Sequence, residues 1–265
     1  MKKSHRENKI LSSTYVGIGI VLVFFIWWLY SFVLVKQGNS PYLFPDPWIV
    51  VKTFGANFLS QKVWNAFGWT MLRLVVGFAV SFLFASILGI LGALFDPIRL
   101  ILKPFVLIMK TVPTAAVVFM ILILAGTNWT PCYLVFLVVF PIVYESFLQG
   151  IDSIDDEIKD ALRLETKFYN PRSVFGILLP NASPYVLLSI VTSLGLALKV
   201  SIMAEIVAGG SSLAGLGRLI YVANSIELDM AQVMALSVLA ILAIAIVDVA
   251  LFFVKKAMKK KDLIS

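Results

Sequence analysis

Residues 153–185 read SIDDEIKDALRLETKFYNPRSVFGILLPNASPY, and they form the one long polar interval between two apolar runs of the chain. Ser153 is followed three residues later by Asp156, a spacing that resembles a capping box and predicts a helix start. Apolar residues then recur at helical spacing and give a charged helix one apolar stripe, made of Ile154, Ile158, Ala161 and Leu162.

A second short helix is predicted to complete this segment. Asn170 followed by Pro171 indicates its start, because Asn caps helices and Pro fits the first helical turn. We expect Pro180 and Pro184 to end the helix–turn–helix before the next apolar run. Such a unit between two membrane spans can dock into a groove of a soluble partner. The alternative is a solvated amphipathic hairpin with no partner.

The composition places this chain in a lipid bilayer. Apolar residues make up 60% of its 265 residues, whereas soluble domains contain about 45–50%. Charged residues are 14%, well below the usual value of about 25%. The formal net charge is +7, but the basic residues stand between apolar runs rather than on one clustered face. Nucleic-acid binding is therefore not expected.

The sequence contains no pattern for metal binding, a disulfide or ATP hydrolysis. It has one cysteine, Cys132, and one histidine, His5. We therefore expect neither a metal site nor a cofactor. The motif G-x-x-x-x-G-K-[ST] is absent, so the chain cannot hydrolyse ATP by the P-loop route. We expect a non-catalytic protein, since no His/Asp/Ser constellation lies at membrane depth.

The apolar runs predict an all-α membrane protein with six transmembrane helices. We expect a tail at 1–13, one transmembrane domain at 14–254 and a basic tail at 255–265. The expected spans lie at about 14–35, 69–95, 105–125, 132–147, 184–208 and 230–254, with the polar segment at 153–183. Residues 48–64 are expected to form an amphipathic helix, either along the membrane surface or against the spans.

The distribution of basic residues predicts the orientation. Of the 22 lysines and arginines, 16 lie in the two tails, in 95–110 and in 148–183, and 4 lie on the opposite side. Because basic residues concentrate in cytoplasmic loops, both termini and the polar segment are expected to be cytoplasmic.

The polar segment resembles the cytoplasmic EAA loop of bacterial ABC importer permeases, whose pattern is E-A-A-x3-G-x9-I-x-L-P. Residues 177–180 (ILLP) match its end in full, and residues 160–163 (DALR) match its start loosely. The glycine of the pattern is absent, and the interval is one residue longer. Four further stretches resemble, in order, elements of the nitrate/sulfonate/taurine group: 70–78 (TMLRLVVGF), 110–115 (KTVPTA), 204–205 (AE) and 215–220 (GLGRLI).

The resemblance implies the membrane-spanning permease subunit of a type I ABC importer in a bacterial cell membrane. It implies a homodimer, two cytoplasmic ATP-binding subunits docked on the polar segment, and an external or periplasmic solute-binding protein. Small anions such as sulfonates or nitrate are the implied solutes, and pyrimidine vitamin precursors stay open. The residues expected to couple to the ATP-binding subunits are Ile158, Asp160, Ala161, Leu162, Leu164, Phe168 and Pro180. A secondary transporter driven by an ion gradient is the alternative function, although no clear inverted repeat is present.

Two places are candidates for the translocation pathway. Thr111, Pro113 and Thr114 interrupt the third apolar run, and irregular backbone at membrane depth is tolerated where it faces protein or water. The alternative there is a proline kink with satisfied threonines. Glu205 lies near the outer end of the fifth run, where a charged side chain usually faces the protein interior. It could line an outer gate or pair with Arg73 or Arg218, and the alternative is a structural ion pair at the subunit interface.

Overall fold

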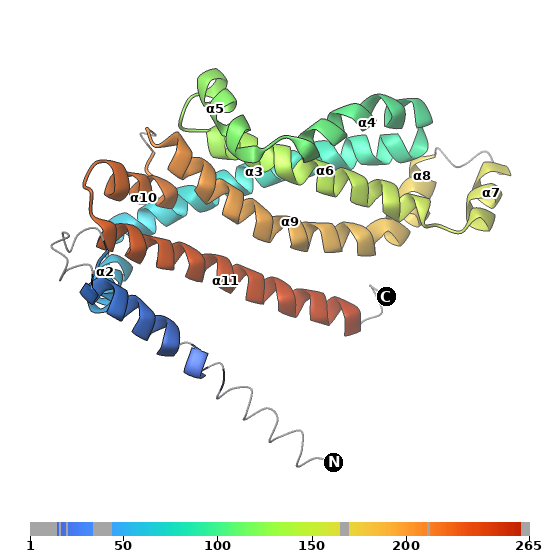
Figure 1. The fold of residues 1–265 in the computed structure, drawn as a ribbon. Helices are drawn as coiled ribbons and strands as arrows, with labels where there is room; N and C mark the ends of the chain where they lie inside the picture. Colours follow the sequence, from blue (N-terminus) through green and yellow to red (C-terminus); the bar gives the residue numbers. More distant parts are fainter. Residues whose placement is uncertain are drawn as a thin grey trace, which may run out of the picture. The chain divides into compact units, whose positions relative to one another are not determined.

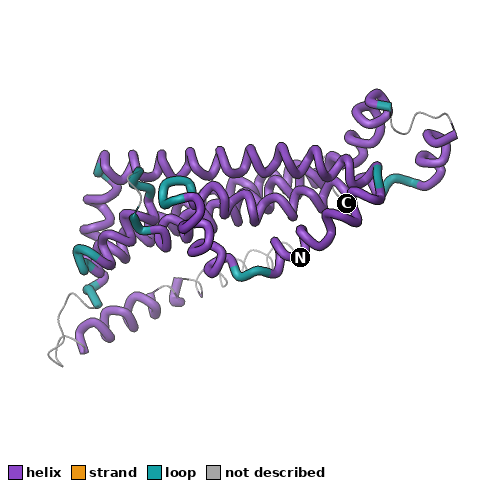
Figure 2. The backbone as a smooth tube through the Cα atoms, turned by 90° about the horizontal axis from the view of Figure 1, so that it is seen from above, coloured by secondary structure: helices purple, strands orange, loops and turns teal. Residues whose placement is uncertain are grey.

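The computed structural model describes residues 15, 17–19, 21–33, 44–164, 170–210 and 213–260, and every regular element in these ranges is helical (Figure 1). Figure 2 shows these helices joined by short loops, with no strand in the described ranges. The labelled helices are α2 (Pro47–Phe58), α3 (Gln61–Leu94), α4 (Asp96–Thr111), α5 (Thr114–Ala125), α6 (Thr130–Asp152), α7 (Asp156–Leu164), α8 (Pro171–Ser173), α9 (Leu179–Ala208), α10 (Leu216–Ser225) and α11 (Met230–Lys260). A π-helical turn, Val174–Leu178, joins α8 to α9.

The lengths and compositions of these helices confirm the predicted all-α membrane fold. Among the described residues, α3, α6, α11 and α9 with its preceding π-helical turn make 4 helices that are long and apolar enough to cross a bilayer. Helices α4 and α5 meet at 106° and would add a fifth crossing as one broken span. The predicted first span, 14–35, lies partly outside the described residues, and its described part between Gly17 and Val33 is helical.

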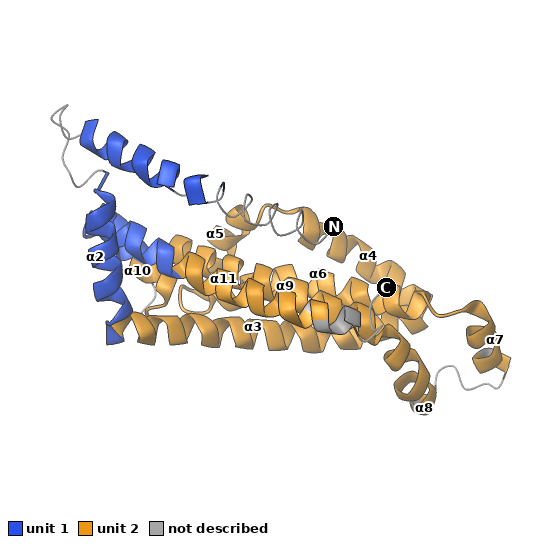
Figure 3. Cartoon of the chain, turned by 90° about the horizontal axis from the view of Figure 1, so that it is seen from below, with its two compact units in different colours: residues 1–61, 220–239 blue, residues 62–219, 240–265 orange. Residues whose placement is uncertain are grey.

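The chain divides into two compact units, which Figure 3 colours separately. The first consists of residues 1–61 and 220–239. Within it, the side chains of Asn57 in α2 and Gln232 in α11 exchange hydrogen bonds of 3.1 and 2.9 Å. The Trp27 indole N–H and the Ser31 hydroxyl donate to the carbonyls of Pro45 and Phe44. These bonds hold the N-terminal helical residues against the segment that leads into α2.

The second unit, residues 62–219 and 240–265, has its core between α6 and α9. The two helices contribute fully buried small and branched residues, among them Leu134, Val135, Val139, Val143, Ala182, Ala197, Leu198 and Ala204. Gly150 permits the close crossing, because an added Cβ there would lie 2.8 Å from the Ala182 backbone. Small residues at such crossings let helix backbones approach in membranes, where packing drives association.

The predicted surface helix at 48–64 is wrong in its extent. Helix α2 ends at Phe58 and α3 begins at Gln61, well before the predicted start of the second span at residue 69. The Leu59 N–H still reaches the Gly55 carbonyl, but the Ser60 N–H turns back to Asn57. The chain therefore bends in a tightened last turn without any Pro or Gly at the bend, and no breaker residue marks it in the sequence.

The expectation that Pro180 and Pro184 end the polar segment is also wrong, because the helix continues through both. Pro180 stands in the first turn of α9, directly after the π-helical turn Val174–Leu178, and the chain stays helical on both sides of it. Pro184 lies inside α9 and cannot donate to the carbonyl of Pro180. The Ser183 hydroxyl donates to that carbonyl instead, at 2.7 Å, so the orphan acceptor is satisfied and the helix persists.

The two predicted helix starts in the polar segment have different outcomes. Asn170 caps the second helix as predicted, since its side-chain oxygen accepts from the Arg172 N–H at 3.1 Å. The capping box at Ser153 is not formed. The Ser153 hydroxyl donates backwards to the Gly150 carbonyl, and the Asp155 carbonyl accepts the first bonds of α7 from Ile158 and Lys159. Helix α7 consequently starts at Asp156.

Candidate functional site

Helix α7 projects from the junction of α6 and α9 as a short amphipathic helix with an exposed surface. Of the residues expected to couple to a partner, Leu164 is 86% and Ile158 is 40% exposed. Asp160, Ala161 and Pro180 are also exposed. Phe168 lies outside the described residues. Exposed apolar residues next to acidic ones make this surface suitable for a soluble partner.

Leu162, the remaining residue of that set, faces the chain's own core. It is 8% exposed and belongs to a cluster that fixes the base of the segment, together with Ile151, Ile154, Val174, Leu178 and Ala182. The structure therefore divides the predicted coupling residues into an outward face and one inward anchor. The same cluster holds the ends of α6 and α9, so α7 is packed directly against two membrane helices.

The interruption predicted in the third apolar run is a sharp corner between α4 and α5. The Thr111 hydroxyl donates to the carbonyl of Leu107 at 3.0 Å, within its own helix. Pro113 precedes the first turn of α5, and both Thr111 and Pro113 are exposed, while Thr114 is half-buried. The corner thus presents irregular backbone on the surface of the chain.

A cavity of about 550 Å³ lies between α4 and α6. Lys110 of α4 forms a bidentate ion pair with Glu145 of α6, with both distances at 2.8 Å. Arg99 and Lys103, which lie on the same helix, also line the cavity. Arg99 is held by Asp152 at 2.7 Å. The sequence indicated these basic residues as markers of one membrane side, but it gave no sign of their acidic partners.

Glu205 is held in a closed polar network rather than facing open space. Its carboxylate accepts from Arg73 at 2.7 Å, from the Thr70 hydroxyl at 2.8 Å and from the Gly217 N–H at 3.0 Å. The side chains of Arg73 and Glu205 are each 2% exposed. Of the two candidate partners, Arg73 is the one that binds Glu205, and the ion pair forms within a single chain.

The same network fixes the glycine-rich stretch that precedes α10. Arg73 also donates to the Leu213 carbonyl, and the Leu216 N–H donates to the Thr70 hydroxyl oxygen at 2.9 Å. Gly215 must lack a side chain, because a Cβ there would overlap the Glu205 carboxylate. Two predicted motifs, 70–78 and 215–220, therefore meet at Glu205. The sequence indicated Arg73 as a candidate partner, but it did not indicate the contacts of Thr70 and Gly217.

A second ion pair at membrane depth was missed by sequence reasoning. Lys199 of α9 lies 3.2 Å from Asp248 of α11, and the two side chains are 50% and 46% exposed. The residues are separated by 49 positions, so no local spacing could have joined them. Their charge inside apolar runs was the one available signal. Among the described residues, no group of three His, Cys, Asp or Glu side chains could hold a metal ion.

The sequence of this chain is similar to a known protein family and to two transport permease proteins. The family model for binding-protein-dependent transport system inner membrane components matches residues 85–261. The aliphatic sulfonates transport permease protein SsuC of Bacillus subtilis (strain 168) is 30% identical over 183 residues, which are 68% of this chain and 64% of that protein. The chain thus spans less than two thirds of the length of SsuC. The taurine transport system permease protein TauC of Escherichia coli (strain K12) is 25% identical over 236 residues, 86% of this chain and 83% of that protein.

Solved structures have the same fold. A chain of the MetNI methionine ABC transporter, in inward-facing conformations, superposes with a TM-score of 0.56 at 17% identity and covers 80% of this chain and 97% of its own. A chain of a bacterial alginate ABC transporter superposes with a TM-score of 0.55 at 16% identity and covers 96% of this chain and 97% of its own. At these identities the likeness concerns the fold alone.

Proposed function

Since the chain belongs to the family of binding-protein-dependent transport system inner membrane components, we propose that it is the permease subunit of an ATP-driven importer and forms the passage for a small solute. The permease acts as a homodimer in the lipid bilayer, and an external binding protein delivers the solute. Two cytoplasmic ATP-binding subunits supply the energy, since this sequence lacks a P-loop motif. Both termini and α7 lie on the cytoplasmic side.

The observation that carries this proposal is the construction of α7. Its outer surface exposes Ile158, Ala161 and Leu164, and its inner residue Leu162 locks into the cluster that joins α6 to α9. A partner that binds the outer surface and changes shape on ATP binding moves both membrane helices through this one anchor. A solvated hairpin without a partner has no need for such an anchor beneath an exposed apolar face.

The proposed solute is a small organic sulfonate. The two relatives are named for aliphatic sulfonates and for taurine, which share a sulfonate group on a short carbon chain. A sulfonate stays anionic at all physiological pH values, so its passage requires fixed positive charge or donor groups at membrane depth.

Substitutions on the outer face of α7 test the proposal. Ala161→Asp and Leu164→Asp each place a new charge on the docking surface without touching the anchor cluster. We expect the chain to reach the membrane in normal amounts and to lose its ATP-binding subunit during affinity purification of the co-expressed complex. Leu162→Asp is unsuitable, because it would bury a charge in the chain's own core.

Ile226→Asp serves as the matched control. Ile226 is 67% exposed, similar to Leu164 at 86%, and it follows α10, far along the sequence from α7. This variant should co-purify with the ATP-binding subunit as the wild type does. Wild-type co-purification from both α7 variants would contradict the docking surface and, with it, the proposed coupling.

A further inference from the structure

The ion pair between Lys199 and Asp248 lies at membrane depth but is only partly covered by the chain. Both residues lie well inside long apolar helices, α9 and α11, and both side chains are about half exposed. Charged groups at membrane depth face protein or water, because contact with hydrocarbon is costly. The exposed side of this pair must therefore open onto an aqueous passage or onto another protein surface.

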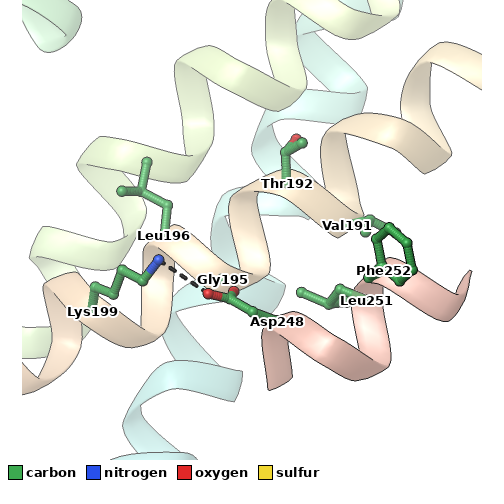
Figure 4. Close-up of a pocket in the computed structure, with 8 residues that line it drawn as sticks. All are labelled: Val191, Thr192, Gly195, Leu196, Lys199, Asp248, Leu251 and Phe252. Carbon is green, nitrogen blue, oxygen red and sulfur yellow. Dashed lines mark hydrogen bonds and ion pairs between the residues drawn. The ribbon is translucent and has the colours of Figure 1, made fainter. Parts of the chain in front are cut away.

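A cavity of about 380 Å³ opens beside the pair, within the range of roughly 300–1,000 Å³ that is usual for small-molecule sites. Figure 4 shows the Lys199 ammonium pointing at the Asp248 carboxylate across Gly195. Thr192 is a further polar residue of the lining. The apolar side chains that line the cavity are Val191, Leu196, Leu251 and Phe252. One cation, one anion and an apolar wall are thus combined in one small space.

Gly195 makes this arrangement possible. A Cβ at residue 195 would lie 2.6 Å from Asp248 Oδ1, so any larger residue would push the carboxylate away from α9. The absence of a side chain lets Asp248 reach across the surface of α9 toward Lys199. The pair therefore depends on a specific feature of the neighbouring helix and does not result from two long side chains meeting by chance.

The charges of the pair restrict what the cavity can hold. Asp248 is the one hydrogen-bond partner of the Lys199 ammonium among the described residues, so two of its three N–H donors stay open to the cavity. A simple anion bound to Lys199 would compete with the Asp248 carboxylate and be repelled by it. A zwitterion would satisfy both groups, because its acidic end can bind Lys199 while its ammonium binds Asp248.

We propose that the Lys199–Asp248 cavity is a solute-contact site that takes a small zwitterion carrying an acidic group and an ammonium group on a short carbon chain, such as an amino sulfonate. Lys199 binds the acidic group, Asp248 binds the ammonium, and the apolar wall contacts the methylene groups. When the cavity is empty, the two side chains neutralise each other. This assignment rests on the proposed importer function and defines its solute class more closely.

Equilibrium binding to the purified permease with its ATP-binding subunits, reconstituted in nanodiscs without any binding protein, tests the assignment. Radiolabelled taurine is the probe, and ethanesulfonate, which lacks the amine, is the competitor. We expect wild-type protein to prefer taurine by about tenfold or more, the effect of one additional charged hydrogen bond. Lys199→Gln should weaken the binding of both solutes by at least about tenfold.

Asp248→Asn gives the decisive result. It should weaken taurine binding and leave ethanesulfonate binding equal or stronger, so that the preference falls to near unity. A purely structural ion pair would change the two affinities together. The matched control is Asp152→Asn, which removes the acidic partner of Arg99 from a pair of similar exposure, 42% and 44%. Asp152 lines neither this cavity nor the one between α4 and α6. This variant should leave the preference unchanged.

Three outcomes would overturn the assignment. The first is a wild-type complex that binds neither solute or does not prefer taurine. The second is an unchanged preference in Asp248→Asn. The third is a loss of dimer from Lys199→Gln and Asp248→Asn with no change in preference, which would make this face an interface between two copies. Failure of the importer function itself is distinguishable, because the wild-type chain would then not purify with ATP-binding subunits.

Discussion

Helix α9 carries two ion pairs that use the same chemistry in opposite surroundings. Glu205 binds Arg73 of α3 with both side chains 2% exposed, whereas Lys199 binds Asp248 of α11 with both about half exposed. The first pair is completed by hydroxyl and backbone donors on every side. The second leaves donors open to a cavity. A pair whose hydrogen bonds are all satisfied within the chain holds structure together, and a pair left partly open can exchange its partner for a solute.

The two ends of α9 are fixed to different parts of the chain. The Glu205 network fixes the loop before α10 onto α3, through Leu213 and Gly217. The opposite end of α9 is fixed to α7 by the cluster that contains Leu162 and Leu178. Lys199 lies between the two fixed ends. A solute bound there would contact the helix to which the proposed coupling segment is anchored.

Neutralising the acidic member of each pair should give the largest difference in stability between the two pairs. Glu205→Gln leaves the Arg73 guanidinium buried without a counter-charge, which typically costs about 3–5 kcal/mol. Asp248→Asn leaves Lys199 half exposed, and such pairs contribute about 0–1 kcal/mol. We therefore expect Glu205→Gln to lower the melting temperature in detergent severely or to abolish expression, and Asp248→Asn to be nearly neutral.

Thermal unfolding of the purified variants, followed by loss of the monodisperse gel-filtration peak, measures both effects. Arg73→Gln provides a control for the charge of the buried pair, because it leaves Glu205 unpaired and should behave like Glu205→Gln. Similar melting temperatures for Glu205→Gln and Asp248→Asn would show that burial does not distinguish the two pairs.

Exchanging the two charges within each pair should also affect the stability of the two pairs differently. Lys199→Asp combined with Asp248→Lys restores opposite charges across an open surface, and the double variant should unfold within a few degrees of the wild type. Arg73→Glu combined with Glu205→Arg cannot recover stability. The donors from Thr70 and Gly217 would then face a guanidinium, which has no acceptor. A stable exchanged Arg73–Glu205 variant would contradict the closed network.

The sequence predicts the elements better than it predicts these pairs. Apolar run length depends on bilayer thickness, and Pro113 breaks a helix locally, so the long helices and an interruption near Pro113 were both predictable. The 106° angle between α4 and α5 and the start of α4 at Asp96, before the expected start of the third span at 105, were not. The persistence of α9 through Pro184 was not, because it depends on one Ser183 hydroxyl taking the place of a missing N–H.

The polar contacts between helices were less predictable, because they also depend on tertiary packing. Asp248 and Lys199 are distant in the sequence, and which side of α11 meets which side of α9 follows from packing rather than from spacing. The burial of Leu162 is a further example. Periodicity defines the apolar stripe of α7, but it does not say which of its residues the rest of the chain covers and which it leaves for a partner.

Replacing the glycines beside the Glu205 and Asp248 carboxylates with alanine should give the smallest effects on stability. Alanine at residue 215 would overlap the Glu205 carboxylate, and alanine at residue 195 would lie 2.6 Å from Asp248 Oδ1. Glu205 cannot move without breaking its bonds to Arg73, Thr70 and Gly217, so Gly215→Ala should destabilise the chain by about 1–3 kcal/mol, as overpacking does. Asp248 can rotate toward solvent, and Gly195→Ala should cost less than about 1 kcal/mol. The same thermal unfolding assay ranks the two variants, and an effect of Gly195→Ala equal to that of Gly215→Ala would mean that Asp248 is held as rigidly as Glu205, which would leave no freedom for a solute to displace it.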